Sequence, residues 1–243
     1  MPEDRVRALL QEIKDACQAS LGADLTGVYV HGSLGFGCFR WEVSDVDFLV
    51  VADAPPVAST ADLLRRLAVI DAHGPPKGLE ASLLLRRDCA VIDHPVPFLM
   101  HYSPAYRDTA RTDPVAYAAQ PVRRDPDLAA HIMVLHQVGF ALCGPPVADV
   151  FGQVPRAAYW DSILLDIRDA EASIAENPVY IILNLCRVLA YGQEGLVLSK
   201  AKGGEWALAH LPAEYHVPVR AALSAYAGRA EPSLAMPPET LHA

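Results

Sequence analysis

The sequence predicts a mixed α/β sheet domain followed by an all-α domain, and three observations carry this prediction. Short apolar runs of strand character alternate with helical periodicity in the N-terminal half. From residue 125 onward the apolar residues recur mainly at helical spacing. The length of 243 residues suits one large domain or two small ones. We place the boundary near Pro155, which gives an α/β domain of residues 1–154 and a helical domain of residues 155–243.

The first half is expected to open with an amphipathic helix over residues 4–20. Strands are predicted in "TGVYVHG", "DVDFLVV" and "GLEASLLL", with a helix in "STADLLRRLAVIDAH" between the last two. Three prolines then mark an irregular stretch, within which "FLMHYS" is a candidate for one more strand. The apolar face of the first helix consists of Val6, Leu9, Leu10, Ile13 and Cys17.

The second half is predicted to consist of helices. Asp125 and Pro126 suit an N-cap and a first helical turn, and "CGPP" is expected to close that helix. Its apolar face consists of Leu128, Ile132, Leu135 and Leu142. Further helices are expected at about 157–175, 178–192, 200–210 and 213–227, and the tail "EPSLAMPPETLHA" shows no period.

Composition narrows the class of protein. Hydrophobic residues make up 52% of the chain and charged residues 20%, which is typical of a globular protein. The net charge of -9 and the scarcity of Lys/Arg runs argue against a nucleic-acid partner and favour a cationic ligand. No apolar run is long enough to span a membrane, and the start lacks the order of a signal peptide, so we expect a cytoplasmic protein.

Cysteines and histidines show no metal-site spacing. The five cysteines are an odd number without a CxxC pair, so neither a disulfide framework nor a zinc site is expected. Among the nine histidines, His131 and His136 lie five apart and no HExxH is present. We interpret the cysteines as core residues and most histidines as core or surface residues.

The stretch "HGSLGFGCFRWEVSDVDFLVV" points to chemistry. Asp45 and Asp47 lie one residue apart at the start of a predicted strand, so their side chains should point to the same face, about 7 Å apart along the chain. Two like charges held this close repel one another unless a cation lies between them. A divalent metal ion is the usual cation at such a site.

Gly32 and Ser33 end the preceding predicted strand at a turn. Backbone N–H groups left unpaired there would form a cradle for phosphate oxygens, and Mg²⁺ suits a site built from few carboxylates, phosphates and water. Taken singly, these residues fit a tight turn, and each aspartate fits an N-cap or a loop. The combination of a strand, Gly-Ser and Asp-x-Asp favours function, because its spacing is restrictive.

These residues resemble the "GS…DxD" signature of the DNA polymerase β-like nucleotidyltransferase superfamily. More narrowly, "GSLGFGCFRWEVSDVDFLVV", "DPDLAAHIMVLHQVGFALCGPP" and "YIILNLCRVLAYGQEGLVLSKAKGGEWALAHLP" resemble the bacterial aminoglycoside adenylyltransferases that modify streptomycin and spectinomycin. The resemblance extends over residues 25–228. It implies a nucleotidyltransferase domain followed by a helical bundle that closes over the nucleotide, with ATP and substrate between them.

The resemblance also implies roles for residues of the first domain. Asp45 and Asp47 match the aspartates that hold metal, with two Mg²⁺ ions expected alongside ATP. Gly32 and Ser33 match the phosphate-contacting turn. Glu80, in "GLEASLL", matches the family's catalytic base, and an exposed residue at a strand end is its alternative role. The base role makes physical sense, since a carboxylate beside two others can have a raised pKa and accept a proton from a sugar hydroxyl.

Three further nucleotide contacts are implied by the resemblance. Asp127 matches an acidic residue near the nucleotide, although an acid in a first helical turn also suits the helix dipole. Lys200, in "LSKAKGGEW", matches a phosphate-binding lysine, with Lys202 as a nearby rival. Tyr226, in "ALSAYAG", matches an aromatic residue over the nucleotide, and core packing is its alternative role.

The acceptor is less closely defined by the sequence. Tyr102, Tyr106 and Trp160 only loosely match the tryptophans that line the antibiotic pocket in the streptomycin enzymes, and the short proline-containing tail replaces a C-terminal helix. We therefore expect Mg-dependent transfer of AMP from ATP to a hydroxyl of a small cationic acceptor, an aminoglycoside foremost. A protein or other non-drug acceptor and a non-catalytic nucleotide sensor are the alternatives. An acidic cluster along the segment predicted to be helical at about 157–175 favours the cation, with a solvated helix face as the alternative: Asp161, Asp166, Asp169, Glu171 and, just beyond it, Glu176.

Overall fold

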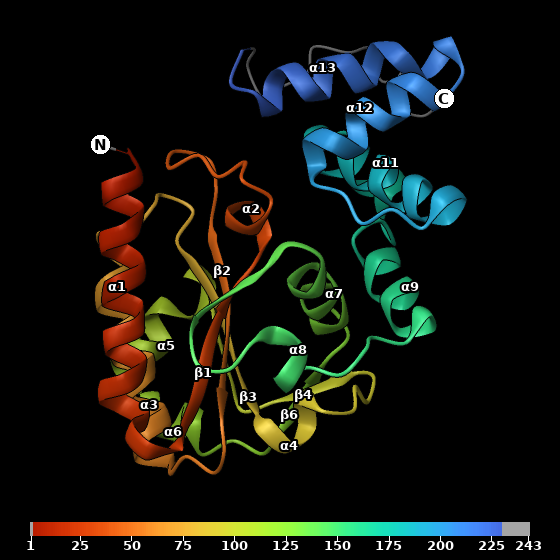
Figure 1. The fold of residues 1–243 in the computed structure, drawn as a ribbon. Coiled ribbons are helices and arrows are strands. Elements are labelled where there is room, and N and C mark those ends of the chain that lie inside the picture. Colours follow the sequence, from red (N-terminus) through yellow and green to blue (C-terminus); the bar gives the residue numbers. More distant parts are fainter. Residues whose placement is uncertain (1, 230–243) are drawn as a thin grey trace. The chain divides into compact units, whose positions relative to one another are not determined.

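The structure, a computed structural model, describes residues 2–229. The chain divides into two compact units, Met1–Ala158 and Tyr159–Ala243. The division lies after Ala158, and the roles expected of the two units stay predictions. The proline-containing tail, residues 231–243, lies outside the described residues. Figure 1 shows the course of the chain through both units.

A five-stranded sheet of order β5-β3-β2-β1-β7 is the centre of the first unit. The central strand β2 pairs with β1 in antiparallel and with β3 in parallel fashion, so the predicted mixed sheet is confirmed. The edge strands β5 and β7 are antiparallel to β3 and β1. The strands of this sheet are β1 (Leu25–Val30), β2 (Val46–Ala52), β3 (Leu79–Leu85), β5 (Met100–Tyr102) and β7 (Phe140–Cys143).

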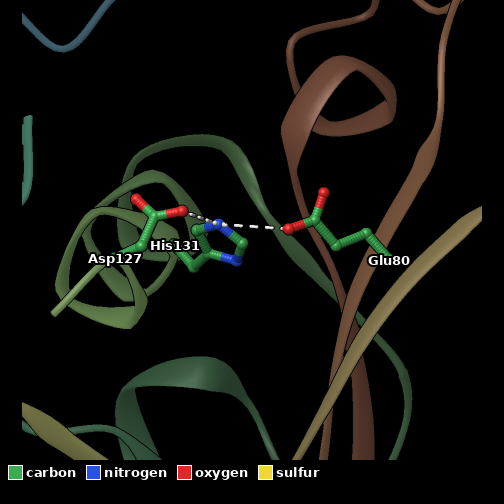
Figure 2. A group of neighbouring side chains, drawn as sticks. All are labelled: Glu80, Asp127 and His131. Atoms are coloured by element: carbon green, nitrogen blue, oxygen red, sulfur yellow. Dashed lines mark hydrogen bonds and ion pairs between the residues drawn. The ribbon is translucent and has the colours of Figure 1, made fainter. Parts of the chain in front are cut away.

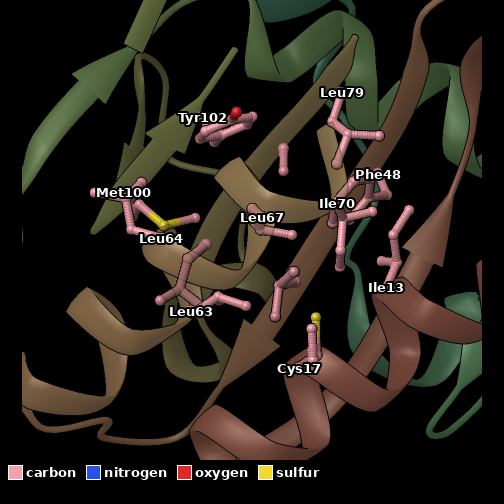
Figure 3. Packing of buried hydrophobic residues seen from close by; sticks show 14 of the residues in the cluster. Ile13, Cys17, Phe48, Leu63, Leu64, Leu67, Ile70, Leu79, Met100 and Tyr102 are labelled. Atoms are coloured by element: carbon pink, nitrogen blue, oxygen red, sulfur yellow. The ribbon is translucent and has the colours of Figure 1, made fainter. Parts of the chain in front are cut away.

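The main core lies on one face of this sheet, beneath two helices. Helix α1 (Pro2–Leu21) presents Leu9, Ile13 and Cys17 at helical spacing, and α3 (Val57–Asp71) crosses over between the parallel strands β2 and β3. Every second residue of the strands points into this core, including fully buried Phe48 (Figure 3). The intervening residues, Asp47 and Glu80 among them, therefore point to the opposite face of the sheet.

Shorter elements complete the first unit. A second sheet pairs β4 (Val96–Phe98) with β6 (Arg123–Asp125). Strand β4 lies within the stretch expected to be irregular, and β6 follows that stretch. Helix α7 (Leu128–Val138) lies on the other side of the main sheet from α1 (Figure 1). The remaining helices are short: α2 (Gly32–Gly35), α4 (Arg86–Cys89), α5 (Arg107–Thr112), α6 (Pro114–Ala118), α8 (Val147–Val150), and the 3-10 turns η1 (Gly22–Asp24) and η2 (Pro104–Tyr106).

The second unit is helical throughout its described part. Its long helix α11 begins with Pro178 at the first turn and ends before Gly195, whose φ of 70° is the left-handed conformation that glycine adopts readily. Helix α12 packs closely on it, because a Cβ at Gly203 would lie 2.8 Å from Cγ of Arg187. The helices are α10 (Ala170–Ser173), α11 (Pro178–Glu194), α12 (Lys200–His210), η3 (Ala213–Tyr215) and α13 (His216–Tyr226), preceded by α9 (Arg156–Leu165), which begins in the first unit.

Three element predictions were wrong. Asp125, expected as the N-cap of a helix with Pro126 in its first turn, is instead the last residue of β6, and the helix α7 begins at Leu128 with Asp127 at its N-cap. The helix expected to run through Leu142 ends at Val138, and Phe140–Cys143 forms β7, because the extended backbone of Gly139 ends the helix and an edge of β1 is available for pairing. The helix expected over residues 157–175 is broken into α9 and α10 by a run of turns. The acidic residues of that segment therefore do not share one helix.

None of the helices formed by residues 2–229 combines the length and apolarity needed to cross a bilayer.

Candidate active site

Three carboxylates converge at one end of the central strands. Asp45 precedes β2, Asp47 is its second residue, and the parallel register pairs Asp47 directly with Glu80 on β3. One carboxylate oxygen from each lies within 4.8 Å of the others, and all three residues are half-buried. The alternation of side chains along a strand, expected from the sequence, thus brings two aspartates together, and the register adds the glutamate.

Gly32 lies directly against Asp47. Its φ is 59°, and a Cβ built on it would lie 1.8 Å from Oδ2 of Asp47. The backbone next to Gly32 is also held to Asp47, because the His31 N–H donates to the Asp47 carbonyl at 3.0 Å. Glycine is therefore required here both for its conformation and for the space that the carboxylate occupies.

Ser33 follows in the one-turn helix α2. Its hydroxyl oxygen is buried and has no hydrogen-bond partner among the described residues. A buried hydroxyl without a partner is costly, and such groups occur at sites that bind a ligand. This observation fits the phosphate-contacting role that the sequence resemblance implies for Ser33.

Helix α7 adds His131 to the group, and Asp127, the N-cap residue of this helix, adds a carboxylate. Nε2 of His131 lies 3.1 Å from Oδ2 of Asp127 and 3.9 Å from Oε1 of Glu80, so the imidazole stands between the two carboxylates (Figure 2). Burial by itself would lower the pKa of His131, but the carboxylates of Asp127, Glu80 and Asp47 outweigh burial and raise the pKa to about 10. His131 is therefore a cation at neutral pH in this arrangement.

His131 is the residue that sequence reasoning missed. Its spacing to His136 fits no metal motif, so the sequence pattern predicts a core or surface role for it. The usable signal was its distance of four residues from Asp127 in a predicted helix, which places both side chains on one face. A second histidine, His31, lies beside it with ring centroids 4.9 Å apart, and burial lowers the pKa of His31 well below its usual value.

Glu80 has the environment of a proton acceptor. Burial raises its pKa, the His131 cation lowers it, and the carboxylates of Asp45, Asp127 and Asp125 raise it further, with an upward net shift. A carboxylate whose pKa is raised is a stronger base than an ordinary one. The residue is thus suited to take a proton from a hydroxyl held nearby.

The donor atoms fit Mg²⁺. Asp45, Asp47 and Glu80 offer only oxygen ligands, which Mg²⁺ prefers, and three carboxylates so close together repel one another without a cation. Glu80, Asp127 and His131 form an overlapping group that mixes oxygen with nitrogen. Because His131 is cationic beside its two carboxylates, the all-oxygen group is the better match to magnesium.

Two predicted nucleotide contacts belong to the second unit. Nζ of Lys200, at the start of α12, lies 4.9 Å from the ring centroid of Tyr180. Tyr226, at the end of α13, is half-buried and packs against the helical core. Their contact with a nucleotide stays a prediction, whereas Gly32, Asp45, Asp47, Glu80 and Asp127 are brought together within the first unit.

Comparisons with known proteins point to one family. Residues 149–243 match the family described as aminoglycoside adenylyltransferase, C-terminal domain. An aminoglycoside (3'') (9) adenylyltransferase of Escherichia coli is 24% identical over 237 residues, covering 95% of this chain and 88% of the relative. A protein of the same name from Klebsiella pneumoniae is 23% identical and covers 93% and 87% of the two chains.

The fold is shared with a solved structure along nearly the whole chain. Spectinomycin adenyltransferase AAD(9) from Enterococcus faecialis, crystallised with ATP and spectinomycin, superimposes with a TM-score of 0.77 at 17% identity. The match covers 97% of this chain and 96% of the other. This chain therefore resembles the aminoglycoside adenylyltransferases in sequence and in fold.

The likeness confirms the recognition made from the sequence. The predicted fold class, a mixed α/β sheet followed by helices, and the assignment to the nucleotidyltransferase enzymes are confirmed with it. At the residue level, the carboxylates of Asp45, Asp47 and Glu80 lie together at the motif on which the sequence resemblance rests.

Proposed function

We propose that this protein transfers AMP from ATP to a hydroxyl of a small cationic acceptor, an aminoglycoside foremost, and releases pyrophosphate. The observation that carries the proposal is the convergence of Asp45, Asp47 and Glu80 within 4.8 Å at the ends of two parallel strands. Nucleotidyl transfer needs such a group, because the triphosphate is held through metal while one carboxylate stays available for a proton.

Asp45 and Asp47 are the proposed ligands of magnesium, with two ions expected when ATP is bound. Bound magnesium would neutralise charge on the phosphates and on the leaving pyrophosphate. Gly32 keeps the Asp47 carboxylate in place by leaving room for it. Ser33 would donate its hydroxyl to a phosphate oxygen, and Asp127 would lie near the nucleotide.

Glu80 is the proposed general base. One of its carboxylate oxygens accepts the proton of the acceptor hydroxyl while the hydroxyl oxygen attacks the α-phosphorus of ATP. The new oxygen–phosphorus bond forms in line with the bond that breaks to the β-phosphate, and pyrophosphate leaves. The upward shift of the Glu80 pKa, caused first by burial, supports this role.

Lys200 is the proposed phosphate ligand of the second unit, and Tyr226 the aromatic residue over the nucleotide. Lys200 is the first residue of α12, where the positive end of the helix dipole disfavours a cation. A phosphate bound there would offset this cost. Tyr226 is partly buried at the edge of the helical core. The remaining part of its ring is compatible with a contact to the adenine base of ATP.

The cationic acceptor rests on two observations. The relatives are named for aminoglycosides, and the net charge of this chain is -9, which attracts a polyamine. A protein or another non-drug hydroxyl compound is the alternative acceptor, and a non-catalytic nucleotide sensor is the alternative without chemistry.

The test is an acceptor panel. The protein is incubated with ATP and Mg²⁺ together with streptomycin, spectinomycin, other aminoglycosides or no acceptor, and pyrophosphate and the adenylylated product are measured. Pyrophosphate that appears only with an aminoglycoside, at one equivalent per product, is the expected result. Nucleotide binding without pyrophosphate release for any acceptor would favour the sensor. Pyrophosphate release only with a protein acceptor would replace the drug by a macromolecule.

A further inference from the structure

We propose that Tyr180 positions Lys200 for the nucleotide phosphates, and that Asp166 anchors Tyr180 for this purpose. The inference rests on the proposed function of Lys200 as a phosphate ligand. It adds two positioning residues from different parts of the second unit, and the sequence resemblance assigns a nucleotide-binding role to neither of them.

The three side chains form a chain of contacts. The Lys200 ammonium lies over the Tyr180 ring, 4.9 Å from its centroid, and the Tyr180 hydroxyl donates to Oδ1 of Asp166 at 2.6 Å. Lys200 begins α12, Tyr180 lies in the first turn of α11, and Asp166 follows the end of α9. All three residues are half-buried, so the contacts are partly shielded from water.

The aromatic face restrains the lysine, and the ring itself carries no charge that would neutralise the ammonium. A lysine side chain loses much rotamer freedom when its ammonium is immobilised, and this loss weakens binding unless it is incurred before the ligand arrives. A ring face attracts an ammonium through its quadrupole, whereas a carboxylate would also compensate its charge. The hydrogen bond from the hydroxyl to Asp166 increases electron density in the ring, which strengthens its attraction for a cation.

The main chain around Lys200 is held as well. Nε of Arg187 donates to the Leu198 carbonyl at 2.9 Å, and the hydroxyl of Ser199 caps α12 by accepting from the Lys202 N–H at 3.3 Å. The backbone that leads into Lys200 is therefore fixed from α11 and by its own cap. Restraint of both the backbone and the ammonium is what a preorganised phosphate ligand requires.

Lys202 provides the contrast. Its side chain is 67% exposed and its ammonium is paired with Glu205, 2.6 Å away on the surface of the same helix. An exposed lysine paired with a carboxylate three residues on is typical of a solvated helix face. Of the two rivals in the sequence motif, Lys200 is the one that neighbouring elements hold in place.

The experiment is a double-mutant cycle on MgATP binding in the full-length protein. Tyr180→Leu removes the ring, Tyr180→Phe keeps the ring but removes the bond to Asp166, Lys200→Met removes the cation, and Lys202→Met is the matched control. Dissociation constants of MgATP come from calorimetry, and thermal unfolding of each variant monitors the fold. Steady-state kinetics divide any effect between KM for ATP and kcat.

We expect Tyr180→Leu to weaken MgATP binding about three- to tenfold and Tyr180→Phe about twofold, mainly through KM. In the Lys200→Met background the Tyr180→Leu change should cost less than about twofold, because the ring acts through the lysine. Lys202→Met should bind MgATP like the wild type. Equal losses from Tyr180→Leu in both backgrounds would mean a structural role and overturn the inference.

The cycle also separates this inference from the proposed function. If Lys200→Met weakens MgATP binding and Tyr180→Leu does not, Lys200 keeps its proposed role and only the positioning by Tyr180 is overturned. If Lys200→Met binds MgATP like the wild type, the phosphate role of Lys200 is wrong, and the positioning inference is overturned with it.

Discussion

A side chain at position 32 would occupy the space of the Asp47 carboxylate, so Gly32→Ala tests the geometry of the site directly. The added Cβ would lie 1.8 Å from Oδ2 of Asp47 and must displace it. We expect transfer activity to fall at least about a hundredfold, because a displaced metal ligand costs several kcal/mol and each 1.4 kcal/mol is tenfold. Activity and the Mg²⁺ dependence of thermal unfolding measure the effect.

Gly37→Ala is the matched control for that substitution. Gly37 has a similar φ of 67°, but a Cβ there would meet no atom within 4 Å. Both variants should lose about 1 kcal/mol of stability from backbone strain, and only the change at Gly32 should lower activity about a hundredfold or more. Equal activities in the two variants would contradict the role given to the Gly32–Asp47 contact.

Glu80→Gln separates a general base from a metal ligand. The amide keeps the shape and the hydrogen-bonding reach of the carboxylate but cannot accept the proton. We expect MgATP binding to stay nearly unchanged while single-turnover rates fall about 10²- to 10⁴-fold. Lost MgATP binding, measured by calorimetry, would instead make Glu80 a metal ligand beside Asp45 and Asp47, and an unchanged rate would place the base elsewhere.

His131→Gln distinguishes a counterion from a ligand. His131, as a cation 3.1 Å from Asp127 and 3.9 Å from Glu80, compensates part of the negative charge that would otherwise attract a metal ion. We therefore expect the variant to be less stable in EDTA and to bind Mg²⁺ more tightly than the wild type. Thermal unfolding over a Mg²⁺ titration measures both. Weaker Mg²⁺ binding would show that the imidazole itself contributes a ligand atom.

The residues of the site were predictable to different degrees. Gly32, Asp45 and Asp47 are close in sequence, so a local pattern was enough to find them. Glu80 needed the family resemblance, because only the pairing of β3 with β2 places it beside Asp47. His131 depends on where α7 packs on the sheet, which no local pattern contains.

At the level of elements, strongly periodic segments were predicted well and the boundaries between unlike elements were not. The central strands β1, β2 and β3 and the helices α1 and α3 lie where their periodicity placed them. Strand β7 was missed because its four residues continue the apolar run of α7, and only Gly139 separates the two. A strand this short is defined by its pairing with β1, which is a long-range contact.

One buried carboxylate connects several elements near the site. Asp71, at the end of α3, accepts hydrogen bonds from the Leu79 N–H and the Tyr102 hydroxyl at 2.8 Å each, and it pairs with Arg107. Its side chain is fully buried. Because Leu79 directly precedes Glu80, this network fixes the start of β3 and hence the position of the proposed base.

Asp71→Ala should therefore be strongly destabilising. The change leaves three donors without their acceptor, and each of the two buried donors, the Leu79 N–H and the Tyr102 hydroxyl, costs about 1–3 kcal/mol when it is left unpaired. Asp93→Ala is the control, because the pair of Asp93 with Arg124 is exposed on both sides and should contribute less than about 1 kcal/mol. Urea unfolding followed by circular dichroism measures both, and similar midpoints for the two variants would contradict the role of Asp71.

At the scale of the whole molecule, the chain separates residues that its proposed function must combine. The carboxylates lie in the unit Met1–Ala158, and Lys200 and Tyr226 in the unit Tyr159–Ala243. Sequence periodicity predicted a change from sheet to helices, but it contains no information on how two units act on one ligand. Binding of ATP by both units stays part of the proposal, with domain closure as its expected consequence.

The net charge of -9 leads to a prediction about the acceptor. If the protein attracts a cationic aminoglycoside electrostatically, its affinity should fall as salt rises from about 0.01 to 0.15 M, because the screening length shrinks from about 30 to 8 Å. Calorimetry at fixed pH measures the dissociation constant across the series. The same aminoglycoside with its amines acetylated is the control, since it keeps the hydroxyls without the charges and should bind weakly at every salt concentration. Salt-independent binding of the cation, or tighter binding of the acetylated form, would contradict the cationic acceptor while leaving nucleotidyl transfer itself intact.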